Sequence, residues 1–158
     1  MSARRFVFHH VWRLPVDRRQ VYAALAAPDD YPSWWPQVRS VRRVDERSGW
    51  ALVRSLAPYS LRLLLTESVQ DESAGVLEVE VAGDLVGWCR WTVQPAPRGS
   101  GAVAVFDQQV DVVGRRLGVA AVVGRPLLVG NHAWMMRGGE RGLTAWLTGS
   151  PASIVTDS

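Results

Sequence analysis

The sequence predicts an α+β fold in which a long C-terminal helix lies across a seven-stranded antiparallel sheet. Apolar and polar residues alternate with a period of two through most of residues 38–112, and short turn-like linkers interrupt them, as in an antiparallel meander. One further strand and a short helix precede this region. A helical pattern over residues 126–147 closes the chain, and its roughly 33 Å length matches the width of about seven strands.

The first element, residues 6–14, is rich in β-branched and aromatic residues and therefore predicts a strand. Asp17 can cap the helix that follows, with Gln20 three positions later completing a capping box. This helix is expected to extend to about Ala27, because Pro28 cannot continue it.

Tyr31-Pro32-Ser33-Trp34-Trp35-Pro36 follows the short helix. Each proline fixes its own φ, lacks an N–H donor and restricts the preceding residue. The segment is therefore expected to form neither a regular helix nor a central strand. We interpret it as a rigid, aromatic-walled corner, of the kind that gates a cavity for a hydrophobic ligand.

The alternating region divides into six candidate strands separated by Gly-, Pro- and Ser-containing turns. They cover residues 38–46, 50–56, 61–70, 76–82, 86–94 and 102–112.

The last helical region covers residues 115–147, with a break expected at Gly124-Arg125-Pro126. A helical wheel places a stripe of residues toward the sheet, flanked by His132 and Gly138. The stripe comprises Leu128, Asn131, Met135, Gly139, Gly142 and Trp146. Glycine costs about 1 kcal/mol in a helix interior, so the glycines imply a close approach of the sheet backbone, space for a ligand, or a kink at Gly138-Gly139.

The bulk composition limits the classes of function. At 158 residues and 47% hydrophobic content, the chain predicts one domain over residues 1–147 and a disordered tail over 148–158. The net charge is +3 and the basic residues are scattered arginines without a nucleic-acid-binding motif, so no nucleic-acid partner is expected. Residues 117–123 form the longest apolar run, which is too short for membrane insertion, and without a signal peptide the protein is expected to be cytoplasmic.

Cofactor chemistry has no support in the sequence. Cys89 is the only cysteine, which excludes an intrachain disulfide and a cysteine-based zinc site, and it is expected to be a small buried hydrophobe. His9 and His10 point to opposite faces of a strand, and no metal-binding or nucleotide-binding motif is present. No metal and no cofactor are therefore expected.

The order of these elements resembles the helix-grip fold of the START/Bet v 1-like (SRPBCC) superfamily, and within it the bacterial polyketide cyclase/dehydrase-like group. The resemblance covers about residues 6–147. It rests on Leu14-Pro15, Val21-Tyr22, the block from Tyr31 to Val38, Gly83-Asp84-Leu85-Val86-Gly87, Trp91, Asn131-His132 and Met135-Met136-Arg137. It implies an apolar ligand held between a curved sheet and a long helix. Some members cyclise or dehydrate polyketides, and others carry lipids or hormones.

Three polar residues are candidate catalytic groups: His132, Arg54 and Arg90. His132 titrates near neutral pH and suits a general acid or base, while an inward-facing arginine can hold an enolate or carboxylate. The alternatives are a histidine satisfied by the sheet backbone and arginines on a solvated face. The candidate ligand-binding residues are Trp34, Trp35, Tyr59, Trp91, Asn131, Met135 and Trp146.

Three functions fit these expectations. The first is binding of a small hydrophobic, cyclic or polyketide-like molecule in an internal cavity. The second is an aromatase/cyclase or dehydratase that promotes aldol closure and loss of water without a metal or nucleotide cofactor. The third is a protein-interaction module of the same fold with a filled interior. Exposed edge strands permit a homodimer but do not require one.

Overall fold

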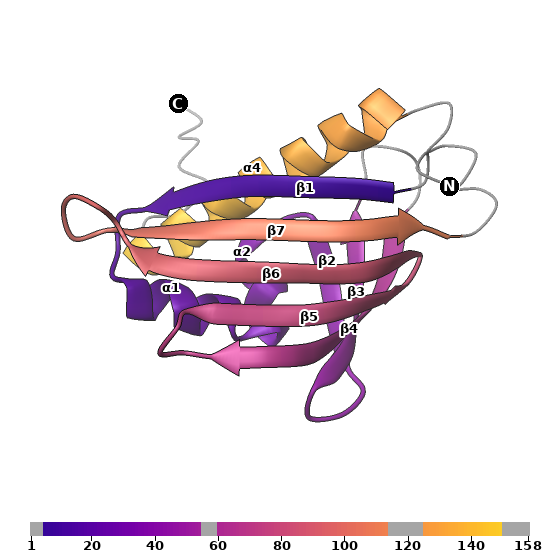
Figure 1. Ribbon diagram of the computed structural model, residues 1–158, viewed down its shortest axis with the longest axis horizontal. Helices are drawn as coiled ribbons and strands as arrows, with labels where there is room; N and C mark the ends of the chain where they lie inside the picture. Colours follow the sequence, from indigo (N-terminus) through magenta and orange to yellow (C-terminus); the bar gives the residue numbers. More distant parts are fainter. Residues whose placement is uncertain (1–4, 55–59, 114–124, 150–158) are drawn as a thin grey trace, which may run out of the picture.

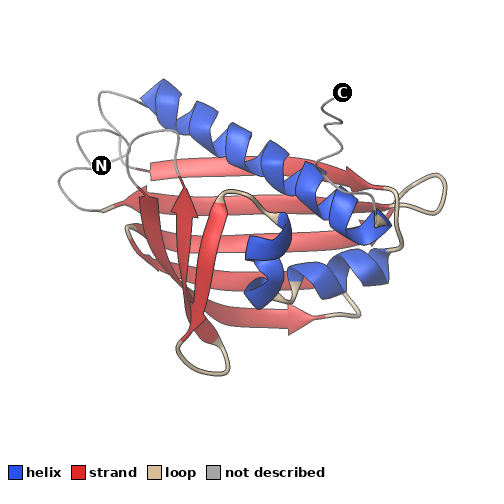
Figure 2. Ribbon diagram, turned by 180° about the vertical axis from the view of Figure 1, so that it is seen from behind, coloured by secondary structure: helices blue, strands red, loops and turns tan. Residues whose placement is uncertain are grey.

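The computed structural model describes residues 5–54, 60–113 and 125–149, apart from the side chains of Arg125 and Leu127 (Figure 1). Seven antiparallel strands form one sheet in the order β1-β7-β6-β5-β4-β3-β2. Within the described residues, three helices and a short 3-10 helix lie on one face of it (Figure 2). The elements are β1 (Arg5–Leu14), α1 (Arg18–Leu25), η2 (Pro28–Asp30), α2 (Tyr31–Trp34), β2 (Val38–Arg43), β3 (Ser48–Arg54), β4 (Ser60–Asp71), β5 (Val76–Gly83), β6 (Leu85–Pro95), β7 (Ala102–Val112) and α4 (Arg125–Thr148).

The predicted fold class is confirmed, because β2 to β7 pair in sequence order and β1 pairs with β7 at one edge. The predicted bounds of β7 are those observed. The strand expected over residues 38–46 is shorter and ends at Arg43. The chain turns there because the carboxylate of Asp45 accepts hydrogen bonds from the backbone N–H groups of Arg47 and Ser48, both at 2.8 Å.

Two local predictions near the N-terminus are wrong. Tyr31–Trp34 forms a helical turn, in which the N–H of Trp35 donates to the carbonyl of Tyr31 at 2.7 Å. The turn is possible because Pro32 lies in the first turn of the helix, where backbone N–H groups have no partner within the helix, so its missing N–H costs nothing. The predicted capping box is also absent, since the side chain of Asp17 makes no capping hydrogen bond to α1.

Most of the predicted inner face of α4 does face the interior, since Leu128, Asn131 and Met135 line the cavity and Gly139 and Gly142 are closely packed, but the buried face is wider than predicted and leaves Trp146 outside. The buried residues of α4 include His132, Met136, Gly139 and Leu143, whereas Trp146 is 50% exposed. The stripe therefore follows i, i+4, i+7 and i+11 from His132. The predicted break at Gly124-Arg125-Pro126 lies partly outside the described residues.

Close packing accounts for the helix glycines, and the predicted ligand space is not found there. A Cβ on Gly142 would lie 1.7 Å from the carbonyl oxygen of Trp34, and one on Gly139 would lie 2.5 Å from the ring of Trp12. The α4 backbone thus contacts the segment that connects α2 to β2. The expected kink is also unnecessary, because α4 is one continuous helix. Among the described residues, no helix is long and apolar enough to cross a membrane.

Candidate functional site

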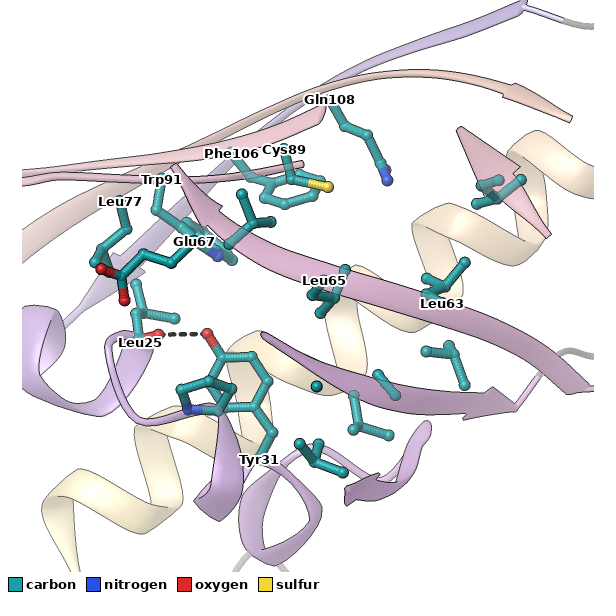
Figure 3. Close-up of a pocket in the computed structure, with 18 of the residues that line it drawn as sticks. Leu25, Tyr31, Leu63, Leu65, Glu67, Leu77, Cys89, Trp91, Phe106 and Gln108 are labelled. Atoms are coloured by element: carbon teal, nitrogen blue, oxygen red, sulfur yellow. Dashed lines mark hydrogen bonds between the residues drawn. The ribbon is translucent and has the colours of Figure 1, made fainter. Parts of the chain in front are cut away.

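A cavity of about 440 Å³ lies between the concave face of the sheet and the helices (Figure 3). Binding pockets for small molecules usually measure about 300–1,000 Å³. Its walls come mainly from alternate residues of the strands, because successive side chains of a strand point to opposite faces. Large apolar side chains dominate the lining, among them Leu63, Leu65, Leu77, Trp91, Phe106 and Val110.

Aromatic rings from the Tyr31-to-Pro36 segment form one wall of the cavity. The indole N–H of Trp35 donates to the carbonyl of Met135 in α4 at 2.9 Å, which fixes the ring against the helix. The hydroxyl of Tyr31 donates to the carbonyl of Leu25 (Figure 3). Both rings therefore have their polar atoms satisfied within the protein, and they offer the cavity mainly apolar surface.

A chain of hydrogen bonds connects three polar side chains at the cavity. His10 Nε2 lies 3.1 Å from His132 Nδ1, and His132 Nε2 lies 2.8 Å from Gln108 Oε1. An amide oxygen only accepts, so His132 Nε2 carries the proton and Nδ1 accepts from His10 Nε2–H. This arrangement turns the amide NH₂ of Gln108, a pure donor, toward the cavity lining (Figure 3).

Burial keeps these groups neutral. Desolvation is the largest cause that lowers the pKa of His132, to about 3, and the neighbouring His10 adds to the shift. His132 is 9% exposed and its ring stacks on Phe8 with centroids 3.6 Å apart. Desolvation likewise lowers the pKa of His10, and burial raises the pKa of the Cys89 thiol to about 12. The cluster therefore presents neutral hydrogen-bonding groups at pH 7.

Five of the predicted site residues line the cavity. They are Trp35, Trp91, Asn131, His132 and Met135.

The structure places the other predicted site residues elsewhere. Trp34 is buried but is not part of the lining, and Trp146 is exposed on α4. Arg54 is exposed. Arg90 lies on the outer face of β6, where it pairs with Glu78 at 2.6 Å and stacks over Trp88. Neither arginine lines the cavity, and Tyr59 lies outside the described residues.

Three polar residues of the site had no role in the sequence-based prediction: Gln108 and Glu67, which line the cavity, and His10, which bonds to His132. Gln108 was assigned no role, His10 was considered only as a metal ligand, and Glu67 was counted simply as part of a strand. Each belongs to a strand, where side chains alternate between the two faces of the sheet. Once the apolar face of the strand is known, the side chain can be assigned to the inner face. Alternation on β7 was the available signal, because Gln108 shares a face with Phe106 and Val110.

The low pKa of His132 predicts a loss of stability in mild acid. Below the ordinary histidine pKa of about 6.5, the unfolded chain takes up a proton that folded His132 does not accept until about pH 3. The stabilisation is complete above pH 6.5 and is lost as the pH falls toward 3. From pH 7 to pH 5 the expected loss from this group is about 2 kcal/mol.

The measurement compares urea unfolding of the wild type and His132→Phe between pH 7 and pH 5, since phenylalanine keeps the stack on Phe8. The variant should be less stable at pH 7 but should lose about 2 kcal/mol less on acidification. His9→Phe, which removes an exposed histidine bonded to Asp107 on the outer face of the same sheet, is measured beside it as a control for the loss of a surface histidine. Equal acid sensitivity of the wild type and His132→Phe would contradict the assignment.

Comparisons with known proteins agree with this geometry. Residues 14–136 match the family model described as polyketide cyclase / dehydrase and lipid transport. No curated protein matches this sequence significantly.

Solved structures with low sequence identity share the fold. A conserved protein from Geobacillus kaustophilus superposes with a TM-score of 0.77 at 12% identity, covering 92% of this chain and 97% of that one. The Zhui aromatase/cyclase from Streptomyces sp. R1128 gives 0.62 at 13% identity, covering 87% and 95%. A START superfamily protein from Mycobacterium smegmatis gives 0.59 at 14% identity, covering 84% and 94%. At these identities the likeness establishes the fold alone.

Proposed function

The chain belongs to the polyketide cyclase/dehydrase and lipid transport family, and we propose that it binds a small hydrophobic, cyclic or polyketide-like molecule between the sheet and α4. The observation that carries the proposal is the cavity of about 440 Å³ with its largely apolar and aromatic lining. Empty apolar space costs stability, because the side chains around it lack contacts on one side. A ligand that fills it restores those contacts.

The polar chain at Gln108 gives the ligand an orientation. His132 holds the amide oxygen of Gln108 at 2.8 Å. The amide NH₂ carries two hydrogens, so beside its hydrogen bond with Cys89 one N–H is available to a ligand. A carbonyl or ether oxygen on an otherwise apolar ligand satisfies that donor. Asn131 and Met135 of α4 and Trp35 and Trp91 supply the surrounding surface.

The cyclase or dehydratase alternative draws support from one observation, the presence of His132 at the cavity. Proton transfer at neutral pH requires a nitrogen that is free and titrates near pH 7. Both nitrogens of His132 are hydrogen-bonded, and its pKa is about 3. Neither Arg54 nor Arg90 joins it, so binding is the better supported function. The cavity also disfavours an interaction module with a filled interior.

The test is native mass spectrometry of protein purified from its own producer, combined with titration of the neutral dye Nile red. We expect a co-purifying small molecule, or dye fluorescence that rises on binding and falls when apolar cyclic ketones compete. Saturable binding with one site per chain supports the proposal. If no small molecule is retained and neither the dye nor a broad apolar panel binds, the proposal is wrong.

A further inference from the structure

Glu67 places a carboxylate inside the largely apolar cavity wall. It lies on the inward face of β4, in series with Leu63 and Leu65, and its side chain lines the cavity (Figure 3). The amide of Gln70, oriented with its nitrogen toward Glu67, donates to both carboxylate oxygens at 3.1 Å. Among the described residues, no arginine or histidine forms an ion pair with Glu67.

The other charged lining residues are either ion-paired or exposed at the rim of the cavity. Asp29 pairs with Arg43 at 2.9 Å, and Glu78 pairs with Arg90 on the outer face. Glu46 and Arg47 are adjacent, exposed and opposite in sign. Glu67 is therefore the partly buried lining charge that has no ion pair in the described part of the chain, whereas Glu46 and Arg47 are exposed at the rim, where the backbone carbonyl of Arg47 accepts from the N–H of Glu67 at 2.8 Å. A partly buried charge of this kind favours a ligand group that donates a hydrogen bond or carries a positive charge.

The sheet register sets Glu67 opposite the polar chain described above. Glu67 pairs with Val79, Val79 with Cys89, and Cys89 with Gln108, so these four residues form one row across β4, β5, β6 and β7. Three strand spacings separate the ends of the row, which is roughly 14 Å between backbones. The row is polar at both ends and apolar in the middle.

We propose that the cavity recognises a ligand with two polar ends. A hydrogen-bond-accepting oxygen meets the amide of Gln108, an apolar body lies over Val79 and Cys89, and a hydroxyl or protonated amine meets Glu67. Carboxylate-bearing ligands such as free fatty acids are excluded from the Glu67 end by charge repulsion. This inference rests on the proposed function and names the chemistry of its ligand.

The test uses four probes that share one ester carbonyl and one chain length and differ at the far end. They are methyl decanoate and the methyl esters of ω-hydroxydecanoic acid, ω-aminodecanoic acid and sebacic acid, the last as the monoester. Affinities are measured at pH 7 by Nile red displacement. We expect the amine and hydroxyl probes to bind best and the sebacate monoester worst, with at least about a tenfold ratio of amine to carboxylate affinity.

Glu67→Gln should lower that ratio at least about tenfold while leaving methyl decanoate affinity nearly unchanged. Glu46→Gln is the matched control, because it removes the same charge from the exposed rim of the same cavity. A ratio that is unchanged in Glu67→Gln, or changed equally in Glu46→Gln, overturns the inference while methyl decanoate binding still upholds the proposed function. If no probe binds the wild type, both proposals fail.

Discussion

Replacing Gly142 by alanine is expected to destabilise the protein by about 3–5 kcal/mol, the upper end of the range for single substitutions. The added Cβ would lie 1.7 Å from the carbonyl oxygen of Trp34. That atom belongs to the backbone at the end of α2, so it cannot rotate away as a side chain can. Either α4 moves outward or the Trp34 segment shifts, and both changes disturb the buried ring of Trp35.

Gly130→Ala is the matched control, because Gly130 belongs to the same helix and a Cβ there meets nothing within 4 Å. Alanine favours the helix, so this variant should gain up to about 1 kcal/mol. Urea unfolding followed by tryptophan fluorescence measures both variants. A loss below 1 kcal/mol for Gly142→Ala would mean that α4 does not pack against the Trp34 backbone as described.

The fold was predictable because each strand carries its own signal. Residues 102–112, for example, alternate throughout their length, and β7 has the predicted bounds and an alternating burial pattern. The orientation of α4 was predictable only in part, correctly at Asn131 and Met135 but not at Trp146. Glycines at 138, 139 and 142 have no side chains to mark a face, so the wheel gave weight to Trp146, which is exposed. The packing of Gly142 on Trp34 depends on a contact between distant segments.

The candidate site was predictable only where a single element carries the signal. Asn131, His132 and Met135 share one helix, and all three line the cavity. The partners of His132 come from β1 and β7, so the hydrogen-bond chain through His10 and Gln108 exists only once the sheet has formed.

Arg90 and Trp91 could not both face the cavity, because adjacent residues of a strand point to opposite faces. The sequence does not say which face of β6 is concave. The structure turns Trp91 inward and leaves Arg90 to pair with Glu78 outside. The same reasoning gives Cys89 its inward position and hence its place beside Gln108.

Filling the cavity from within should abolish ligand binding without unfolding the protein. Val79 lines the cavity midway between Cys89 and Glu67, so Val79→Trp places an indole where the proposed ligand lies. We expect Nile red affinity to fall at least about a hundredfold, equivalent to roughly 2.7 kcal/mol. The melting temperature should stay level or rise, because the new ring fills empty apolar space.

Val7→Trp adds the same ring to the outer face of the sheet, where Val7 is 70% exposed, and should bind the dye as the wild type does. Leu65→Trp repeats the filling from β4, so the test does not depend on the folding of one variant. Loss of binding in both filled variants, with native near-ultraviolet circular dichroism and normal binding by Val7→Trp, places the ligand in the cavity. Full binding by a folded Val79→Trp or Leu65→Trp variant would instead show that the ligand binds at the surface of the protein. The row from Glu67 to Gln108 would then have no role in recognition, since a ligand outside the cavity reaches neither end of it.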